Sequence, residues 1–261
     1  MHIDPVAQAY AHLDALSLKE VAEFKPRPPR FNPSSIGNCS RQQYYKGINV
    51  TPEPSPGFLR LYSRPGDFYH DETRCVMYEA GVEFDGLEFD LENRKVKELN
   101  ACNIEITHNG ATFPVRGRGD GKIKVNGEWL YNELKSVDGW KYRAMRNAYL
   151  KGDLEKYLRA NYQSYFDQCN SMCAPEMLDM PGTYLIIVNR GSCQFGFTDR
   201  KYQNPEGGMV FRFDPDRWEQ QKTKMAMVTK RIAAGDPPLR GHAEGSKKCQ
   251  QCAYEGKCWN E

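Results

Sequence analysis

The sequence of 261 residues has no long apolar run and no excess of one charge sign. Its longest apolar stretch, residues 184–188, is far shorter than the roughly 20 residues that a membrane-spanning helix needs. The first residues lack the basic and apolar blocks of a secretory signal peptide. Because 36 Lys and Arg face 34 Asp and Glu, the net charge of +2 gives no general attraction for polyanions. We therefore expect a cytoplasmic protein without a membrane segment.

A glycine-rich phosphate loop, internal repeats and low-complexity tracts are also absent from the sequence. Without such a loop, the Rossmann and P-loop classes are excluded. The sequence does contain nine cysteines. An odd number of cysteines in a chain without a secretory signal favours metal or redox chemistry over a disulfide framework.

The hydrophobic pattern predicts a mixed α/β order of a helix, antiparallel strands, further helices and further strands. Expected helices cover 4–24, 34–46, 66–80, 140–151, 154–172 and 216–234. Expected strands cover 102–107, 112–125, 128–137, 183–189, 193–198 and 209–212. The prolines of 26–33 predict an extended strap after the first helix, because proline fixes φ and has no amide proton.

The most informative segment surrounds the pair Asn126-Gly127. This pair favours a two-residue hairpin turn, because both central residues of that turn need positive φ. If the two strands flank the turn directly, their register places Asp120 opposite Glu133. At a Cβ separation of roughly 5 Å the two like charges repel. A shared divalent cation would make the pairing favourable, and oxygen ligands suit Mg²⁺ or Mn²⁺.

Lys135 lies two residues after Glu133, so the period of a strand places both on one face. An ammonium group near a bound cation can orient a water molecule and neutralise charge that develops on a phosphate. The same parity argument assigns four further basic residues to the face of Asp120: Arg116, Arg118, Lys122 and Lys124. The alternative is an ordinary hairpin with a solvated polar face.

Asp120, twelve intervening residues and then Glu133-Leu134-Lys135 resemble the active-site signature of the PD-(D/E)xK nuclease superfamily. The segment 66–70 is similar to the Gly-x-x-x-His element of its RecB-like branch. The resemblance implies a restriction-endonuclease-like α/β fold, with a mixed central sheet flanked by helices. It also implies a metal ion held by His70, Asp120, Glu133 and the backbone carbonyl of Leu134, with Lys135 as a catalytic residue.

A helical segment further along the chain resembles the glutamine motif of the same family. Gln163 takes the place of the motif's glutamine, which the resemblance adds to the catalytic set. The tyrosine that usually follows four residues later is replaced by Asp167, and Tyr165 is the nearest aromatic residue. The identity of the aromatic partner of Gln163 is therefore open, and Tyr165 could equally pack in the core.

Three cysteines lie close together near the end of the sequence, at Cys249, Cys252 and Cys258. Three thiolates leave a tetrahedral site incomplete, and Cys39 is the candidate for the fourth ligand. This arrangement resembles the iron–sulfur nucleases, which include the AddB nuclease domain and the CRISPR-associated adaptation exonucleases. The resemblance implies a [4Fe–4S] cluster that staples the two ends of the domain; zinc is the alternative occupant, and His242 an alternative ligand.

The remaining five cysteines have apolar neighbours, and we expect them to be small buried hydrophobic residues: Cys75, Cys102, Cys169, Cys173 and Cys193. The domain boundaries that follow are an N-terminal helix and strap over 1–33, one nuclease domain over 34–258, and a tail over 259–261.

The family resemblance implies DNA as the partner, and the small net charge confines the contacts to local patches. Arg41 is one candidate, and Lys141, Arg143 and Arg146 follow Trp140 in a run that mixes aromatic and basic residues. Such a run suits base stacking and backbone contact on a single strand. It also fits an amphipathic helix with a solvated basic side.

The expected function is therefore a Mg²⁺- or Mn²⁺-dependent DNA exonuclease that acts on single-stranded ends, in recombination, repair or phage DNA processing. A helicase or recombination protein is the partner that the resemblance implies, since the chain has no helicase motif of its own. Two alternatives stay open: a non-catalytic iron–sulfur adaptor that binds DNA, and a structure-specific endonuclease on the same fold.

Overall fold

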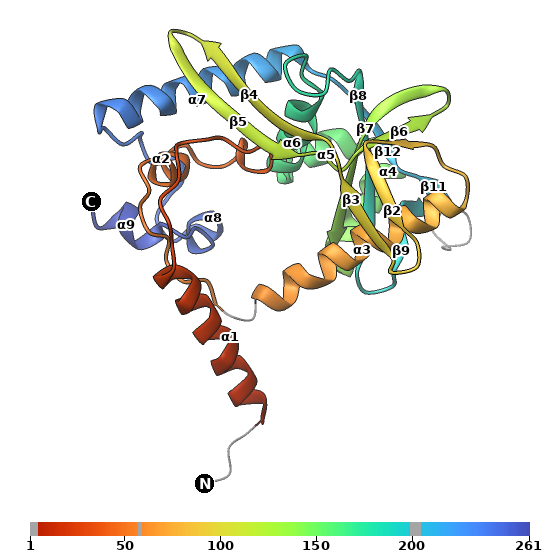
Figure 1. The fold of residues 1–261 in the computed structure, drawn as a ribbon, viewed down its shortest axis with the longest axis horizontal. Helices are drawn as coiled ribbons and strands as arrows, with labels where there is room; N and C mark the ends of the chain where they lie inside the picture. The colour runs from red at the N-terminus through yellow and green to blue at the C-terminus, as the bar shows by residue number, and fades with distance from the viewer. Residues whose placement is uncertain (1–4, 57–58, 199–204) are drawn as a thin grey trace.

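The computed structural model describes residues 5–56, 59–198 and 205–261 and has a mixed α/β architecture (Figure 1). The helices are α1 (Pro5–Ala22), the 3₁₀ turn η1 (Pro33–Ser35), α2 (Ser40–Gly47), α3 (Leu59–Glu79), α4 (Gly139–Tyr149), α5 (Leu154–Asn161), α6 (Gln163–Cys173), α7 (Pro215–Ala234), α8 (Lys247–Gln250) and α9 (Glu255–Trp259). Of the helices in these ranges, none has the length and apolar character needed to cross a membrane.

The strands belong to one larger sheet and three small ones. They are β1 (Phe84–Asp85), β2 (Leu87–Asp90), β3 (Lys95–Glu98), β4 (Ala101–His108), β5 (Ala111–Arg118), β6 (Lys122–Val125), β7 (Glu128–Val137), β8 (Gly182–Asn189), β9 (Gln194–Phe195), β10 (Phe197–Thr198), β11 (Pro205–Gly207) and β12 (Met209–Arg212). The central sheet has the order β1-β6-β7-β8-β12, and β9 pairs with β8 at one end. The small two-stranded sheets are β2-β3, β4-β5 and β10-β11.

The two middle strands of the central sheet, β7 and β8, are parallel, whereas the pairs β6-β7 and β8-β12 are antiparallel. The central sheet is therefore mixed and flanked by helices, as the sequence predicts. Both middle strands are buried along most of their length. The chain runs from β7 to β8 through α4, α5 and α6, which cover one side of the pair (Figure 1).

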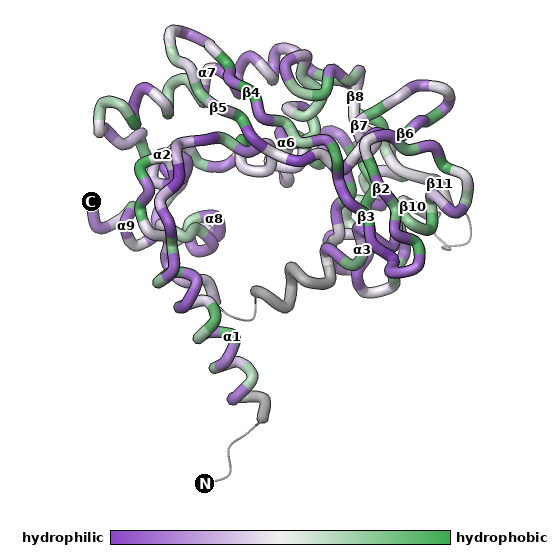
Figure 2. Tube along the Cα trace, viewed as in Figure 1, coloured by the Kyte–Doolittle hydropathy of each residue, from purple (hydrophilic) through white to green (hydrophobic). Residues whose placement is uncertain are grey.

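Two larger apolar clusters lie on either side of the molecule. One joins α2, the β4-β5 hairpin and α7, through buried residues such as Tyr44, Phe113 and Met225. The other joins α4, α5 and α6 to the central sheet, through residues such as Tyr142, Phe166 and Ile187. The first half of α1 extends away from both clusters, and its residues alternate between hydrophilic and hydrophobic (Figures 1 and 2).

Most expected elements are present, and three differ in an informative way. The expected strand 112–125 is two strands, β5 and β6, which belong to different sheets because the chain turns between them. The expected helix 154–172 is broken into α5 and α6 at Tyr162, whose backbone leaves the helical region at φ −135° and ψ 46°. Likewise the expected strand 193–198 consists of two short strands, β9 and β10.

Helix boundaries also differ from the sequence expectation. α2 begins at Ser40 rather than near Ser34, because Cys39 is extended at φ −53° and ψ 136° and only η1 precedes it. α3 begins at Leu59 and runs through Pro65, whereas we placed its start at Gly66. The first helix is α1, and Asp4, where we placed its start, lies outside the described residues. Strands β1, β2 and β3 were not expected, since their short, charged segments show no continuous apolar face.

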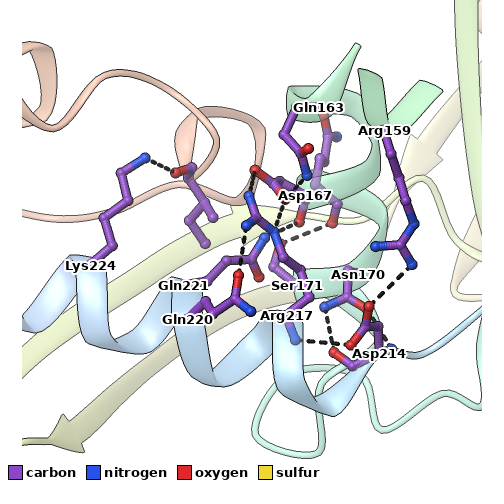
Figure 3. Close-up of polar contacts among 12 residues, drawn as sticks. Arg159, Gln163, Asp167, Asn170, Ser171, Asp214, Arg217, Gln220, Gln221 and Lys224 are labelled. Atoms are coloured by element: carbon purple, nitrogen blue, oxygen red, sulfur yellow. Dashed lines mark hydrogen bonds and ion pairs between the residues drawn. The ribbon is translucent and has the colours of Figure 1, made fainter. Parts of the chain in front are cut away.

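A buried ion pair joins α6 to α7 (Figure 3). Asp167, whose side chain is 1% exposed, accepts hydrogen bonds from Arg217 Nε at 2.7 Å and from Arg217 Nη2 at 2.8 Å. Gln221 donates to the backbone carbonyl of Asp167 at 3.0 Å. The Asn170 side chain forms two further hydrogen bonds with the backbone of Asp214: it donates to the carbonyl at 3.0 Å and accepts from the amide at 2.7 Å. These contacts fix the position of α6, which also contributes to the site described below.

We predict that Arg217→Leu lowers the free energy of unfolding by about 3 kcal/mol, because the Asp167 carboxylate is then left buried without its counter-charge. Arg212→Leu is the matched control, since Arg212 forms an ion pair with Glu128 on the exposed surface and its loss is expected to cost under about 1 kcal/mol. Urea denaturation of both variants measures the difference. Equal losses of stability would contradict this account of the α6–α7 contact.

Candidate functional site

The hairpin of β6 and β7 has the predicted register. Val125 pairs with Glu128 across the Asn126-Gly127 turn, and both turn residues have positive φ, at 51° and 83°. The ladder ends at Lys122, however, so Asp120 is not in a strand directly opposite Glu133, as we had expected. Asp120 instead lies in a loop just before β6.

The loop still brings Asp120 against β7. Gly121 has φ +94°, and a Cβ added there would lie 2.7 Å from Leu87 Cγ, so only glycine fits this turn. Asn132 donates its backbone amide to the Gly121 carbonyl at 2.9 Å. The backbone amide of Leu134 donates to Asp120 Oδ2 at 3.0 Å, so the carboxylate lies beside the Glu133-Leu134 peptide.

Asp120 is surrounded by positive and donor groups. Arg74 Nη2, on α3, lies 2.9 Å from Asp120 Oδ1, and His70 Nδ1, one helical turn before Arg74, lies 3.7 Å from Oδ2. Burial alone would raise the pKa of Asp120, but Arg74, His70 and the Leu134 amide outweigh it and hold that pKa below its usual value. Asp120 is therefore an ionised, buried carboxylate. Burial, reinforced by Arg74, also lowers the pKa of His70.

Glu133 lies on the buried part of β7, with its side chain 1% exposed. The Tyr131 hydroxyl and the Gln168 amide donate to its carboxylate, the latter at 3.0 Å to Oε1. Lys135 Nζ lies 2.6 Å from the same oxygen. Burial raises the pKa of Glu133, even though Lys135 and Tyr131 favour its charged form.

Lys135 is held from three directions. Its ammonium group contacts Glu133, donates to Gln168 Oε1 at 2.9 Å and lies 5.3 Å from the centre of the Tyr165 ring. Burial alone would lower the pKa of this lysine, but Glu133 raises it, so the ammonium stays charged. Tyr165 thus packs against Lys135 at the edge of the apolar cluster of α4, α5 and α6.

Three residues at this site were not predicted from the sequence: Arg74, Tyr131 and Gln168. Arg74 follows His70 by four residues, which is the spacing of one helix face. Tyr131 precedes Glu133 by two residues, as Lys135 follows it, so the period of a strand places all three together. These spacings are visible in the sequence. They show which side chains share a face of a helix or strand, but not which residues of other elements that face contacts.

The glutamine at the site is Gln168, and the prediction for Gln163 is wrong in this respect. Gln163 donates its amide to Asp167 at 3.0 Å, near the α6–α7 ion pair (Figure 3). The break at Tyr162 begins α6 anew at Gln163, and the helix face that meets β7 carries Tyr165 and Gln168 instead.

The basic residues assigned to the face of Asp120 also lie elsewhere. Arg116 and Arg118 belong to β5, which pairs with β4 in a separate sheet. Lys122 forms an ion pair with Asp85 at 3.2 Å, and Lys124 forms one with Glu83 at 3.1 Å. Parity fails here because the strand that we expected to be continuous turns at Gly119 to Gly121.

The donor set around Asp120 suits a hard divalent cation in kind, with two carboxylates, an imidazole and the nearby carbonyl of Leu134. In their present positions, no three His, Cys, Asp or Glu side chains of the described residues form a group that could hold a metal ion. Arg74 and Lys135 instead supply the charge that neutralises the two carboxylates.

A second group of interest lines a cavity of about 590 Å³ between α2 and the C-terminal segment. All four cysteines predicted as ligands line it: Cys39, Cys249, Cys252 and Cys258. Burial raises the pKa of the Cys252 thiol, and the other three thiols raise it further, so each of the three lies within electrostatic range of Cys252. His242 and Lys224 line the same cavity.

The other five cysteines follow the prediction with one exception. Cys75, Cys102, Cys169 and Cys173 are buried, whereas Cys193 is exposed and has a positive φ of 57°. Its neighbour in space is the Tyr69 hydroxyl, 3.6 Å from the Cys193 sulfur. Cys193 is thus a turn residue between β8 and β9 and not a core residue.

Two of the four residues that we expect to contact DNA are buried. Arg41 is buried, where it donates to the Tyr45 hydroxyl at 2.9 Å and contacts Glu261 at 3.2 Å. Arg146 is buried on the inner face of α4. Neither residue belongs to a solvated basic face in this structure.

The outer face of α4 does present the other two residues to solvent. Arg143 is exposed, Lys141 is half-buried, and Trp140 has 67% of its surface exposed. Lys141 Nζ lies 3.4 Å from Asp138 Oδ2, so part of its charge is already matched. The contact of Lys141 and Arg143 with DNA stays a prediction.

Comparison with known proteins assigns no family to the chain. No protein-family model matches the chain, and no curated protein matches it. Among solved structures, one described as "Crystal structure of SSO0001" is similar, with 13% identity and a TM-score of 0.44 over 96% of each chain.

We predict that Arg74→Gln lowers the free energy of unfolding at pH 7 by about 3 kcal/mol, because Asp120 then stays buried without its closest cation. Arg74 lowers the pKa of Asp120, so this stabilisation is present above the unfolded pKa of about 3.9 and is lost as the pH falls. The difference from the parent protein should therefore shrink under acidic conditions.

Arg94→Gln serves as the control for this prediction. Arg94 also bonds to two carboxylates, Glu72 and Glu79, but all three side chains are partly exposed. Its loss should cost about 1 kcal/mol or less. Chemical denaturation across a pH series measures both variants, and a constant difference for Arg74→Gln at every pH would contradict the assignment.

Proposed function

We propose that this protein is a metal-dependent DNA exonuclease of the PD-(D/E)xK, RecB-like type, acting on single-stranded ends. The observation that carries the proposal is the meeting of Asp120, Glu133 and Lys135 at one place on β7. Lys135 Nζ lies 2.6 Å from Glu133 Oε1, and Asp120 accepts a hydrogen bond from the backbone amide of Leu134, which follows Glu133. An ordinary solvated hairpin would leave these groups in water, whereas here Asp120 and Glu133 are both largely buried.

Under this proposal, Asp120, Glu133, His70 and the Leu134 carbonyl would hold the divalent cation. When bound, such a cation lowers the pKa of a water molecule and neutralises charge on the scissile phosphate. Burial raises the pKa of Glu133, and a bound cation would favour the charged form of this carboxylate. Arg74 and Lys135 are the groups whose pairing with the carboxylates would have to adjust.

Lys135 is the residue we assign to water and phosphate. Its ammonium stays charged and is held by Glu133 and Gln168, so its direction is fixed before any substrate arrives. Such preorganised charge stabilises the extra negative charge of an in-line displacement on phosphorus. Gln168 keeps both Glu133 and Lys135 in place, and Tyr165 closes the site on the side of α6.

We assign the [4Fe–4S] cluster to the cavity that Cys39, Cys249, Cys252 and Cys258 line. Four thiols around a cavity of about 590 Å³ suit a cluster, whose ligand sulfurs stand further apart than those around a single zinc ion. A cluster there would join α2 to the C-terminal segment, 210 positions later in the sequence. Closing so long a loop is costly in entropy, which explains the use of a covalent staple.

We predict that Lys135→Gln lowers the rate of DNA cleavage by about 10²–10³-fold, because it removes a preorganised charge at the reacting phosphate. Lys122→Gln is the control on the same hairpin, since Lys122 pairs with Asp85 away from the site. A labelled single-stranded oligonucleotide with Mg²⁺ or Mn²⁺ is the substrate, and circular dichroism verifies that both variants fold. Undiminished cleavage by Lys135→Gln would refute the mechanism.

The same assay separates the alternatives. A parent protein that binds the oligonucleotide but never cleaves it, with either metal, would support the non-catalytic adaptor. Cleavage of a circular single strand would support an endonuclease, because an exonuclease cannot begin on a substrate without ends.

We predict that protein purified without oxygen contains about four iron atoms per chain and absorbs near roughly 400 nm, as iron–sulfur clusters do. Cys258→Ala should lose most of the iron and the absorbance, because it removes one of the four ligands. Cys193→Ala is the matched control, since Cys193 is exposed and does not line the cavity. One zinc ion per chain and no visible absorbance would identify zinc as the occupant.

A further inference from the structure

The extended strap after α1 forms one wall of a second cavity, far in sequence from Asp120 and Glu133. The cavity has a volume of about 430 Å³ and lies between the end of α1, the strap and the end of α2. This size falls within the usual range for sites that bind small molecules or nucleotides. Four basic side chains line it: Lys25, Arg27, Arg30 and Lys46.

Four basic side chains line this cavity, against two carboxylates, those of Glu20 and Glu23. Among the described residues, none of the four basic side chains forms an ion pair with a carboxylate. Two glutamates line the side of α1, but Glu23 pairs with Lys19 at 3.7 Å, and Glu20 also has a partner. Burial, together with the guanidinium groups of Arg30 and Arg27, lowers the pKa of Lys46, so the three cations repel one another.

The strap holds its arginines in a regular arrangement. Residues 24–30 have no helix or strand, and prolines at 26, 28 and 29 favour the polyproline II conformation. That conformation has three residues per turn and would place residues 27 and 30 on the same side of the strap, and both arginines line the cavity. The backbone of the strap is also held by hydrogen bonds at Arg27 and at Phe31. The Arg27 amide donates to Asn49 Oδ1 at 2.7 Å, and Phe31 exchanges backbone hydrogen bonds with Pro114 and Arg116.

We propose that this cavity, which we call the strap pocket, binds the phosphate groups of a single-stranded nucleic acid. Guanidinium groups form paired hydrogen bonds with phosphate, and Lys46 adds a third cation between them. Phe24 lines the same cavity and provides an aromatic surface for a base or sugar. A fixed, unneutralised row of cations costs the protein electrostatic energy, which a bound polyanion recovers.

The number of cations favours a strand over a free anion. Four basic side chains line the cavity, which exceeds the charge of one isolated phosphate, whereas several phosphates of one strand match it. The choice of nucleic acid rests on the proposed nuclease function. The strap pocket would then anchor the strand away from the reacting phosphate, and it would do so through phosphates and without reading base sequence.

The test compares Arg27→Glu/Arg30→Glu with Lys151→Glu/Lys156→Glu, which changes the net charge equally at exposed positions outside the pocket. Binding of a fluorescent single-stranded oligonucleotide is measured in EDTA, so that no cleavage occurs. We expect the strap double variant to bind at least tenfold more weakly, and the control less than threefold. Loss of two phosphate contacts should also reduce the salt dependence of log K by about 1.4, at roughly 0.7 per contact on a single strand.

Equal affinity and equal salt dependence for the two double variants would overturn the proposal. Arg27→Gln/Arg30→Gln, which removes the charge without reversing it, repeats the test if the glutamate variant unfolds. Inorganic phosphate added as a competitor distinguishes the ligands. Calorimetry measures whether millimolar phosphate binds to the strap pocket. If it binds there, and oligonucleotide affinity does not depend on Arg27 and Arg30, the pocket binds a free anion and the proposal is wrong.

The outcome is separable from that of the proposed function. Because binding is measured without metal, the strap pocket is tested even if the parent protein never cleaves DNA. The converse result is cleavage that depends on Lys135 while oligonucleotide affinity is unchanged in the Arg27 and Arg30 variants. That result would support the nuclease assignment and overturn only the proposal for the strap pocket.

Discussion

The burial of two neighbouring carboxylates governs the arrangement of the elements around them. Glu133 is buried and Asp120 is largely buried, and their like charges would be unfavourable there without partners. α3 supplies Arg74 and His70 to one carboxylate, while β7 and α6 supply Tyr131, Lys135 and Gln168 to the other. Strand β7 of the central sheet and the helices α3 and α6 therefore meet at these two carboxylates.

α6 connects this point to the rest of the molecule. One of its faces holds Gln168 and Tyr165 against β7, and another holds Asp167 against Arg217 on α7. α7 in turn reaches the segment before Cys39, because Lys224 donates to the carbonyl of Ile36 at 2.9 Å (Figure 3). The cysteine-lined cavity and the carboxylates are thus attached to the same pair of helices, although each lies at a different end of it.

The sequence was sufficient where a local rule determines the structure. The Asn126-Gly127 turn sets the register of β6 and β7, and the two-residue period brings Lys135 to Glu133, because both depend only on neighbouring residues. It was insufficient where a turn reverses a strand or a helix restarts. The glycines beside Asp120 divide β5 from β6, and the break at Tyr162 replaces Gln163 by Gln168 at the site. Arg74 could not be chosen over other arginines, since its role depends on how α3 packs against the sheet.

The site combines residues that are close in sequence, on the β6-β7 hairpin, with residues of the long connection between the parallel strands β7 and β8. The β6-β7 hairpin joins residues close in sequence and can form early, with Glu133 and Lys135 already on one strand. Gln168 belongs to the long crossover between β7 and β8, whose ends must be brought together before parallel hydrogen bonds form. The buried environment that shifts the pKa values of Glu133 and Lys135 therefore requires the crossover to be in place, because α6 covers the two side chains with Gln168 and Tyr165.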